Sequence, residues 1–264
     1  MGVPAPGMVE MIETALALTD VHTHIGQFHI LQGVTFAIRT GGITALVGRN
    51  GAGKTTTLRT IMGLWKASRG TITVRDRSIT ALPTAEIARL GFGYVPENIG
   101  IFGQLTVREN MILAARSGNL DRDRLARLFG YFPPLEQFWN MSAGHLSGGQ
   151  KQMLSIARAI IQPRQILLMD EPTKGVAPGI IDAIVEALRD CNREGTTILL
   201  VEQNYDVALA LAEDVVLMDG GKVKYAGAME AFQSDPKLGE SALGFAAALD
   251  LNARPGSGRL VESI

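Results

Sequence analysis

The alternation of hydrophobic and polar positions divides the chain into a strand-rich opening, a helical middle and a final part in which strands and helices alternate. In the opening, short apolar and β-branched stretches predict strands at 15–21, 33–39, 44–47 and 71–75. Gly41 and Gly42 predict a turn between the second and third of these strands, and a helix is expected from Lys54 to about Leu64. The close spacing is typical of hairpins and favours an antiparallel arrangement.

Three helices are expected in the middle of the chain. Thr106 and Glu109 have the spacing of a capping box, in which each side chain satisfies a free amide of the first turn, so a helix begins there and runs to about Ala115. The other two are predicted at 121–129, ended by Gly130, and at 149–161, stopped by Pro163.

The final part favours a parallel sheet. Residues 166–169 are an unbroken apolar run, as expected of a strand that is buried on both faces. Further along, helices are predicted at 178–193 and 204–212, with strands at 197–201, 215–218 and 222–225. The last two strands form a hairpin across Asp219, Gly220 and Gly221. Strands that alternate with helices indicate the α/β class.

A phosphate-binding loop follows the third strand. Residues 48–55 fit the pattern G-x-x-x-x-G-K-[ST], with a strand before the loop and a helix after it. Glycines let the backbone approach an anion, Lys54 places a charge on the terminal phosphates, and the Thr55 hydroxyl is a hard oxygen ligand for Mg²⁺. The predicted nucleotide-binding residues are Gly48, Arg49, Asn50, Gly51, Ala52, Gly53, Lys54, Thr55 and Thr56.

Two acids end the buried strand at 166–169. In open α/β sheets, ligands bind at the carboxyl ends of the strands, where Asp170 and Glu171 stand. Asp170 is expected to hold Mg²⁺ directly or through water. Glu171 is expected to orient or deprotonate the water that attacks the γ-phosphate.

A second anion site is predicted before the helix at 149–161. Ser147 can cap this helix, and Gly148 and Gly149 allow a phosphate to approach closely, with Gln150 completing the motif.

The phosphate-binding loop, the motif at 147–150 (called the signature below) and the acid pair occur together in this chain. The set resembles the ATP-binding-cassette (ABC) ATPases over about residues 14–232. The resemblance implies a RecA-like P-loop core of the α/β class with an N-terminal antiparallel β part and an inserted helical part. The expected division is a tail at 1–13, a cassette at 14–240 whose helical part spans about 97–162, and an extension at 241–264. In this family two cassettes sandwich ATP and Mg²⁺, so Ser147 would serve the partner's nucleotide.

Some positions depart from the commonest pattern of that family. Glu97 stands where most members have Gln, and its carboxylate can still bind Mg²⁺; Gln203 stands where most have His, and its amide can hydrogen-bond the γ-phosphate. Ile25 replaces the aromatic residue that usually stacks on adenine, with Phe28 as a possible substitute. The phrases VPEN, EPTKGVAP and LLVEQN are similar to the LivF-type ATPase subunit of branched-chain amino-acid importers and their relatives for other small polar solutes.

Composition narrows the class of partner. The 264 residues carry 25 Lys and Arg against 26 Asp and Glu, and nucleic-acid binding generally needs a basic surplus. Mean hydropathy is high, at +0.15, yet the longest apolar run, 207–212, is far shorter than the ~18 residues that span a bilayer. Cys191 is the single cysteine, and no secretory signal is recognisable. A cytoplasmic subunit on the inner face of the membrane, without a nucleic-acid partner, is expected.

The resemblance implies three kinds of partner: a second ATPase subunit, transmembrane permease subunits and, indirectly, a solute-binding protein. A related but distinct ATPase is favoured over a second copy of this chain, although a homodimer stays open. Phe102 is a candidate for the surface that receives a partner. The alternatives are an ABC-type ATPase that does not act in transport and a regulatory module that does not hydrolyse ATP. The latter would be expected to lack Lys54 or Glu171.

His22, His24 and His29 leave one further alternative. The first two would point to the same face of a strand, and a metal site with His29 is conceivable, whereas a solvated sheet edge is the simpler interpretation because no acid or cysteine cluster accompanies them.

Overall fold

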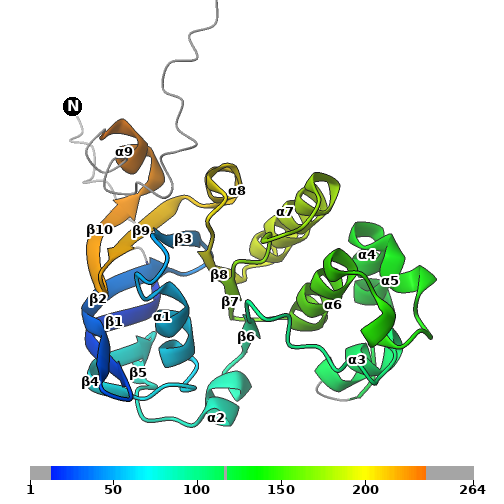
Figure 1. Ribbon diagram of the computed structural model, residues 1–264, viewed down its shortest axis with the longest axis horizontal. Helices are drawn as coiled ribbons and strands as arrows, with labels where there is room; N and C mark the ends of the chain where they lie inside the picture. The colour runs from blue at the N-terminus through cyan, green and yellow to red at the C-terminus, as the bar shows by residue number, and fades with distance from the viewer. Residues whose placement is uncertain (1–12, 116–117, 236–264) are drawn as a thin grey trace, which may run out of the picture.

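Two sheets form one side of the molecule, and a group of helices lies on the other (Figure 1). The computed structural model describes residues 13–115 and 118–235. The expected terminal segments, 1–13 and 241–264, fall outside these ranges except for Glu13. Across the ranges described, no helix combines the length and the apolar character needed to cross a membrane.

The smaller sheet is antiparallel, as predicted for the opening of the chain. Its strands, in spatial order, are β2 (Phe28–Arg39), β1 (Thr14–Ile25), β4 (Ala67–Val74) and β5 (Arg77–Ser78). β1 and β2 are longer than predicted because a two-residue turn joins them, with Gly26 at φ +59°. Polar residues such as His22, which pairs with Gln32, hid this extension in the hydrophobic pattern.

The larger sheet has six strands, of which five are parallel. Their spatial order is β10 (Lys222–Ala228), β9 (Asp214–Asp219), β3 (Ile43–Gly48), β8 (Thr197–Val201), β7 (Ile166–Asp170) and β6 (Phe92–Val95). β10 pairs with β9 in the predicted hairpin. Every residue of β3, β7 and β8 is buried. The α/β class is therefore confirmed, while the four-residue β6 was too short for the pattern to show.

The parallel strands serve two cores at once. In β7, Leu167 and Met169 join the core that also contains residues of the helices between Val107 and Leu211, whereas Leu168 joins the core that also contains β1, β2 and the helix Lys54–Ile61. Successive residues of a strand point to opposite faces, so a continuous apolar run is what such a strand requires.

The expectation of hairpin-like pairing fails at Gly41 and Gly42. A turn occurs there, but β2 and β3 belong to different sheets. β3 pairs with β8 on one side and β9 on the other, so both of its edges are already occupied.

Helices cover the larger sheet and form the helical part. α1 (Lys54–Ile61) and α2 (Thr84–Arg89) lie near the sheets, as do α7 (Pro178–Arg193), α8 (Tyr205–Leu211) and α9 (Met229–Ser234). The helical part contains α3 (Val107–Ala114), α4 (Arg122–Tyr131), α5 (Pro133–Gln137), the short 3₁₀ helix Ala143–His145 and α6 (Gly148–Ile160), gathered away from the smaller sheet (Figure 1). The capping box of Thr106 and Glu109 is confirmed. The prediction that Gly130 ends a helix is wrong, because α4 continues to Tyr131.

Ion pairs join the helical part to α7. Arg124 and Arg127 of α4 both donate to Glu194, which follows α7, and the Tyr131 hydroxyl donates to Asp190 within α7. This contact fixes one side of the helical part against the core.

Candidate functional site

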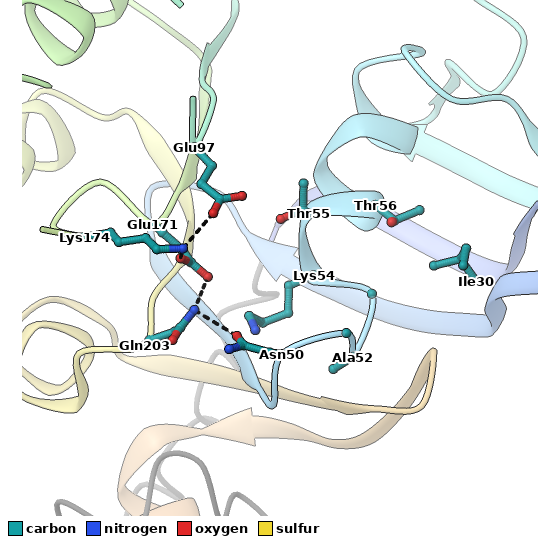
Figure 2. Close-up of a pocket in the computed structure, with 12 residues that line it drawn as sticks. Ile30, Asn50, Ala52, Lys54, Thr55, Thr56, Glu97, Glu171, Lys174 and Gln203 are labelled. Atoms are coloured by element: carbon teal, nitrogen blue, oxygen red, sulfur yellow. Dashed lines mark hydrogen bonds and ion pairs between the residues drawn. The ribbon is translucent and has the colours of Figure 1, made fainter. Parts of the chain in front are cut away.

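The predicted motifs meet at one edge of the larger sheet. β3, β8, β7 and β6 are neighbours, and the residues that carry chemistry follow the carboxyl end of each strand. In that order they are the loop at 48–55, Gln203, the pair Asp170 and Glu171, and Glu97. Because these strands are parallel, residues far apart in the sequence come together at one cavity of about 390 Å³ (Figure 2). Asp170 does not line this cavity itself but contacts Thr55, which does.

The backbone of the phosphate-binding loop depends on glycine. Gly48 has φ +146°, and a Cβ atom there would lie 2.1 Å from the carbonyl oxygen of Met218. Gly53 has φ +101° at the start of α1, where no side chain caps the helix. The amides of the first turn, at Lys54, Thr55 and Thr56, are thus left for an anion at the positive end of the helix dipole.

The Lys54 side chain folds back onto the backbone of this loop. Its side chain is buried, and its Nζ donates to the carbonyls of Gly48 at 2.8 Å and Arg49 at 3.2 Å. Burial lowers the pKa of Lys54 from its ordinary value, opposed by the charges of Glu171 and Asp170. Residues 50–56 line the cavity, while Gly48 and Arg49 hold the lysine.

Asp170 has the chemistry of a magnesium ligand. It is fully buried, and burial raises the pKa of its carboxyl to about 6. Thr55 Oγ1 donates to Oδ1 at 3.0 Å, while Oδ2 has no hydrogen-bond partner among the residues described. A buried carboxylate oxygen with an open lone pair beside a hydroxyl fits a hard divalent cation. Thr55 and Asp170, two of the three donors predicted from sequence, therefore fit Mg²⁺. Glu97, the third, lines the same cavity, where its carboxylate accepts from Lys174.

Glu171 is held in an unusual conformation next to Asp170. Its φ is +52°, a region that residues other than glycine seldom occupy, and its amide donates to Val201 O at 2.9 Å. Its side chain accepts a hydrogen bond from Gln203 Nε2, which also donates to Asn50 Oδ1 at 3.1 Å. Strain of this kind at the end of a strand is typical of functional positions.

Three residues near the site were not singled out in the sequence. Lys174 forms ion pairs with Glu97 and Glu171, and these two carboxylates raise its pKa above the ordinary value. Ile30 lines the cavity, whereas Ile25 is half-buried and Phe28 is 64% exposed, and neither of them lines it. Ile30 is thus the apolar residue of β2 on the cavity wall, while the contact of Ile25 or Phe28 with adenine stays a prediction.

Glu202 is the third of these residues, and it ties the two loops of the site together. It is buried, and its carboxylate accepts from Thr173 Oγ1 at 2.7 Å and from the amides of Thr173, Gln203 and Asn204. Desolvation raises its pKa, although these donors act in the opposite direction. A glutamate directly after an apolar strand is usually exposed to solvent, so the sequence does not indicate that Glu202 is buried and holds two loops. This role is visible only from the residues that it contacts.

The signature lies outside this cavity, on the helical part. Ser147 caps α6 and forms a capping box with Gln150, while Ser147 and Gly148 are exposed. The predicted second anion site is thus not part of the cavity at the chain's own phosphate-binding loop.

The three histidines pack against one another near the turn between β1 and β2. His22 Nδ1 is 2.9 Å from His29 Nε2, and the rings of His24 and His29 stack with centroids 4.2 Å apart. Among the described residues, no group of three His, Cys, Asp or Glu side chains could hold a metal ion. His22 and His24 lie on β1, which pairs with β2 on one side and β4 on the other, so they do not form the sheet edge that was expected.

A parallel sheet with a glycine-rich loop, an uncapped helix and acids at its carboxyl edge defines a P-loop nucleotide-binding protein. Residues 31–174 match the family model described as ABC transporter. The chain belongs to the ABC transporter family and is one of its ATPases, as predicted.

Curated relatives support this assignment along most of the chain. A branched-chain amino-acid transport ATP-binding protein, BraG of Pseudomonas aeruginosa, is 35% identical over 87% of this chain and 99% of its own length. A probable counterpart, LivF of Archaeoglobus fulgidus, is 37% identical over 76% of this chain and 86% of its own. The lipopolysaccharide export protein LptB of Acidithiobacillus ferridurans is 32% identical over 81% and 90%.

Solved structures agree with the fold. An ATP-binding subunit of an ABC transporter superposes with a TM-score of 0.74 at 30% identity, covering 83% of this chain and 92% of the other. A cassette dimer bound to ADP and phosphate gives 0.72 at 25% identity, covering 81% and 98%. ATPase subunits of this family dimerise and work with permease components.

Proposed function

We propose that this chain powers the import of branched-chain amino acids or a related small polar solute. The similarity to BraG, which spans 87% of the chain, is the observation that carries the proposal. The relatives also include an exporter, so the direction of transport and the solute are the parts to be tested. An ABC-type ATPase outside transport is not favoured, because the relatives named above are transport proteins. The cassette is taken as residues 14–240, with its helical part at about 97–162.

The residues of the cavity divide the work of hydrolysis. Amides at 50–56 and the Lys54 ammonium bind the phosphates of ATP, and Thr55, Asp170 and Glu97 are the residues that would hold Mg²⁺. Mg²⁺, when bound, neutralises phosphate charge. Glu171 orients the attacking water and accepts its proton, and Gln203, which already contacts Glu171, donates to the γ-phosphate.

A second subunit completes each site. Ser147, Gly148, Gly149 and Gln150 begin α6 on the helical part, where they can cover the nucleotide of a partner cassette. A related but distinct ATPase is the proposed partner, and a second copy of this chain is the alternative. With permease subunits attached, the chain would lie on the inner face of the membrane.

Gln203→His should leave turnover within about tenfold of wild type. Histidine keeps a hydrogen-bond donor at the position that contacts Glu171 and Asn50, and orientation of the γ-phosphate needs no more than a donor. Steady-state ATP hydrolysis measures the effect, with Gln203→Leu as the matched variant that removes the donor. Complete loss of activity in Gln203→His would contradict a purely orienting role.

Exposed apolar side chains suggest where the permease binds. Phe102 is 50% exposed, Leu113 60% and Met141 39%, and all three belong to the helical part. Large apolar side chains left in solvent are typical of surfaces that meet a partner. Asn110 holds the backbone of Phe102 through hydrogen bonds to its amide and carbonyl, both at 2.9 Å, so this residue is presented by an ordered loop.

A pull-down tests the proposed assembly. The tagged chain, extracted from membranes in mild detergent, should bring down multi-spanning proteins and a second ATPase. The double variant Phe102→Ser, Leu113→Ser should lose the multi-spanning proteins, whereas Leu64→Ser, at an equally exposed apolar position outside the helical part, should retain them. Recovery of the wild-type chain without any integral membrane protein would refute the transport proposal.

The solute is tested on the same assembly. Reconstituted with its solute-binding protein in liposomes, the complex should hydrolyse ATP faster when leucine, isoleucine or valine is present. If ATP hydrolysis does not respond to these amino acids but responds to another small polar solute, the chain serves an importer of that solute instead.

A further inference from the structure

Lys174 bridges two acids that come from different strands. Its Nζ lies 2.7 Å from Glu97 Oε1, beyond β6, and 3.0 Å from Glu171 Oε2, beyond β7. Figure 2 shows the lysine reaching between these carboxylates on the wall of the cavity opposite Thr55. Its side chain is 57% exposed, so packing does not explain why it occupies this place.

The other lysine of the cavity has a different task. Lys54 donates to backbone carbonyls of its own loop, on the side where phosphates would bind. Lys174 instead neutralises Glu97 and Glu171, whose carboxylates would repel each other across the gap that the ammonium fills. Lys54 is thus positioned to bind the phosphates of a ligand, whereas Lys174 binds carboxylates of the protein itself.

Mg²⁺, bound as proposed above, and the Lys174 ammonium would compete for one carboxylate, that of Glu97. A cation held by Glu97 would come within a few ångströms of an ammonium that contacts the same carboxylate, and like charges at that separation repel strongly. Because the lysine stem is long and half in solvent, the ammonium can leave without disturbing the core.

We propose that Lys174 is a positioning residue that holds Glu97 and Glu171 in the nucleotide-free chain and is displaced by the Mg²⁺ that enters with ATP. The inference rests on the roles proposed above for Glu97 and Glu171, and it does not depend on which solute is transported. Lys174 then sets the Mg²⁺ concentration at which nucleotide binds, and its return after hydrolysis favours release of the cation.

The test measures nucleotide binding rather than turnover. A fluorescent, non-hydrolysable ATP analogue is titrated at a series of Mg²⁺ concentrations, and the half-saturating Mg²⁺ concentration is compared between variants. Lys174→Met, which keeps the length and removes the charge, should lower that concentration about three- to tenfold, as expected for two partly exposed ion pairs. Lys174→Arg, which keeps the charge, should stay within about twofold of wild type.

Binding at the two extremes of Mg²⁺ concentration separates this proposal from a phosphate-binding role. In EDTA, Lys174→Arg should bind the analogue like wild type and Lys174→Met no more tightly, because the uncovered Glu97 and Glu171 repel the phosphates. At saturating Mg²⁺ the three proteins should bind the analogue equally. Weaker binding of Lys174→Met at saturating Mg²⁺, or an unchanged or higher half-saturating Mg²⁺ concentration, would overturn the proposal. The Mg²⁺ role of Glu97 is tested apart from it with Glu97→Leu, which removes the oxygen ligand that either Glu or Gln would supply. If Glu97→Leu does not alter the Mg²⁺ dependence, the proposed Mg²⁺ role of Glu97 fails, and the proposal for Lys174 is overturned with it.

Discussion

Glu171→Gln should reduce ATP hydrolysis by about two to four orders of magnitude while ATP still binds. The amide keeps the size of the side chain and its contact with Gln203 but cannot accept the proton of the attacking water, and a positioned general base contributes about 10²–10⁴-fold. Steady-state phosphate release measures the first part, and equilibrium binding of ATP the second.

A matched control separates this effect from a change in overall charge. Glu230→Gln removes an exposed acid from α9, away from the cavity, and should leave turnover unchanged. Turnover of Glu171→Gln close to that of wild type would remove Glu171 from the role of base. Asp170, its neighbour, would then need to be tested in the same way.

Phe132→Ala should lower the free energy of unfolding by about 3–5 kcal/mol, a large share of the roughly 5–15 kcal/mol that stabilises a typical domain. The ring is fully buried between the ends of α4 and α5, in the core beneath the helices. Truncation leaves a cavity that the surrounding helices fill only in part. Unfolding in urea, followed by circular dichroism, measures the change.

Phe28→Ala is the matched substitution at the surface. Phe28 is 64% exposed at the turn between β1 and β2, so the same loss of atoms should change the free energy of unfolding by less than about 0.5 kcal/mol. Equal effects of the two substitutions would show that Phe132 does not support the core as its burial implies.

Much of the fold was predictable because local sequence features define the buried parallel strands and the first residues of the helices. The strand at 197–201 and the helix at 178–193 have the predicted bounds, since an apolar run and a proline at the first helical position define them. β1 and β2 were underestimated because polar residues such as His22 and Gln32 pair there, across shifts of register that hydrophobic periodicity does not show. The pairing of β3 could not be predicted, because it depends on which strands occupy its two edges.

The site was predictable wherever a motif carries its own chemistry. Lys54, Thr55 and Asp170 are recognisable from spacing, and the sheet brings them together. Lys174 and Glu202 have no such signal, because their importance comes from what lies next to them in space. Ile30 lines the cavity because β2 passes beside the larger sheet at this point. The amide of Gln32 in β2 donates to Gly221 O, between β9 and β10, at 2.9 Å.

The way in which the helical part is inserted has a mechanical consequence. The chain leaves the sheet at the carboxyl end of β6 and returns at the amino end of β7, the neighbouring strand. The line between these two points runs along the strands and is a natural hinge axis. A rotation about it would carry the helices α3 to α6, whereas Glu97, two residues beyond β6, and Glu171, directly after β7, would move least. The ion pairs from α4 to Glu194 oppose such a rotation.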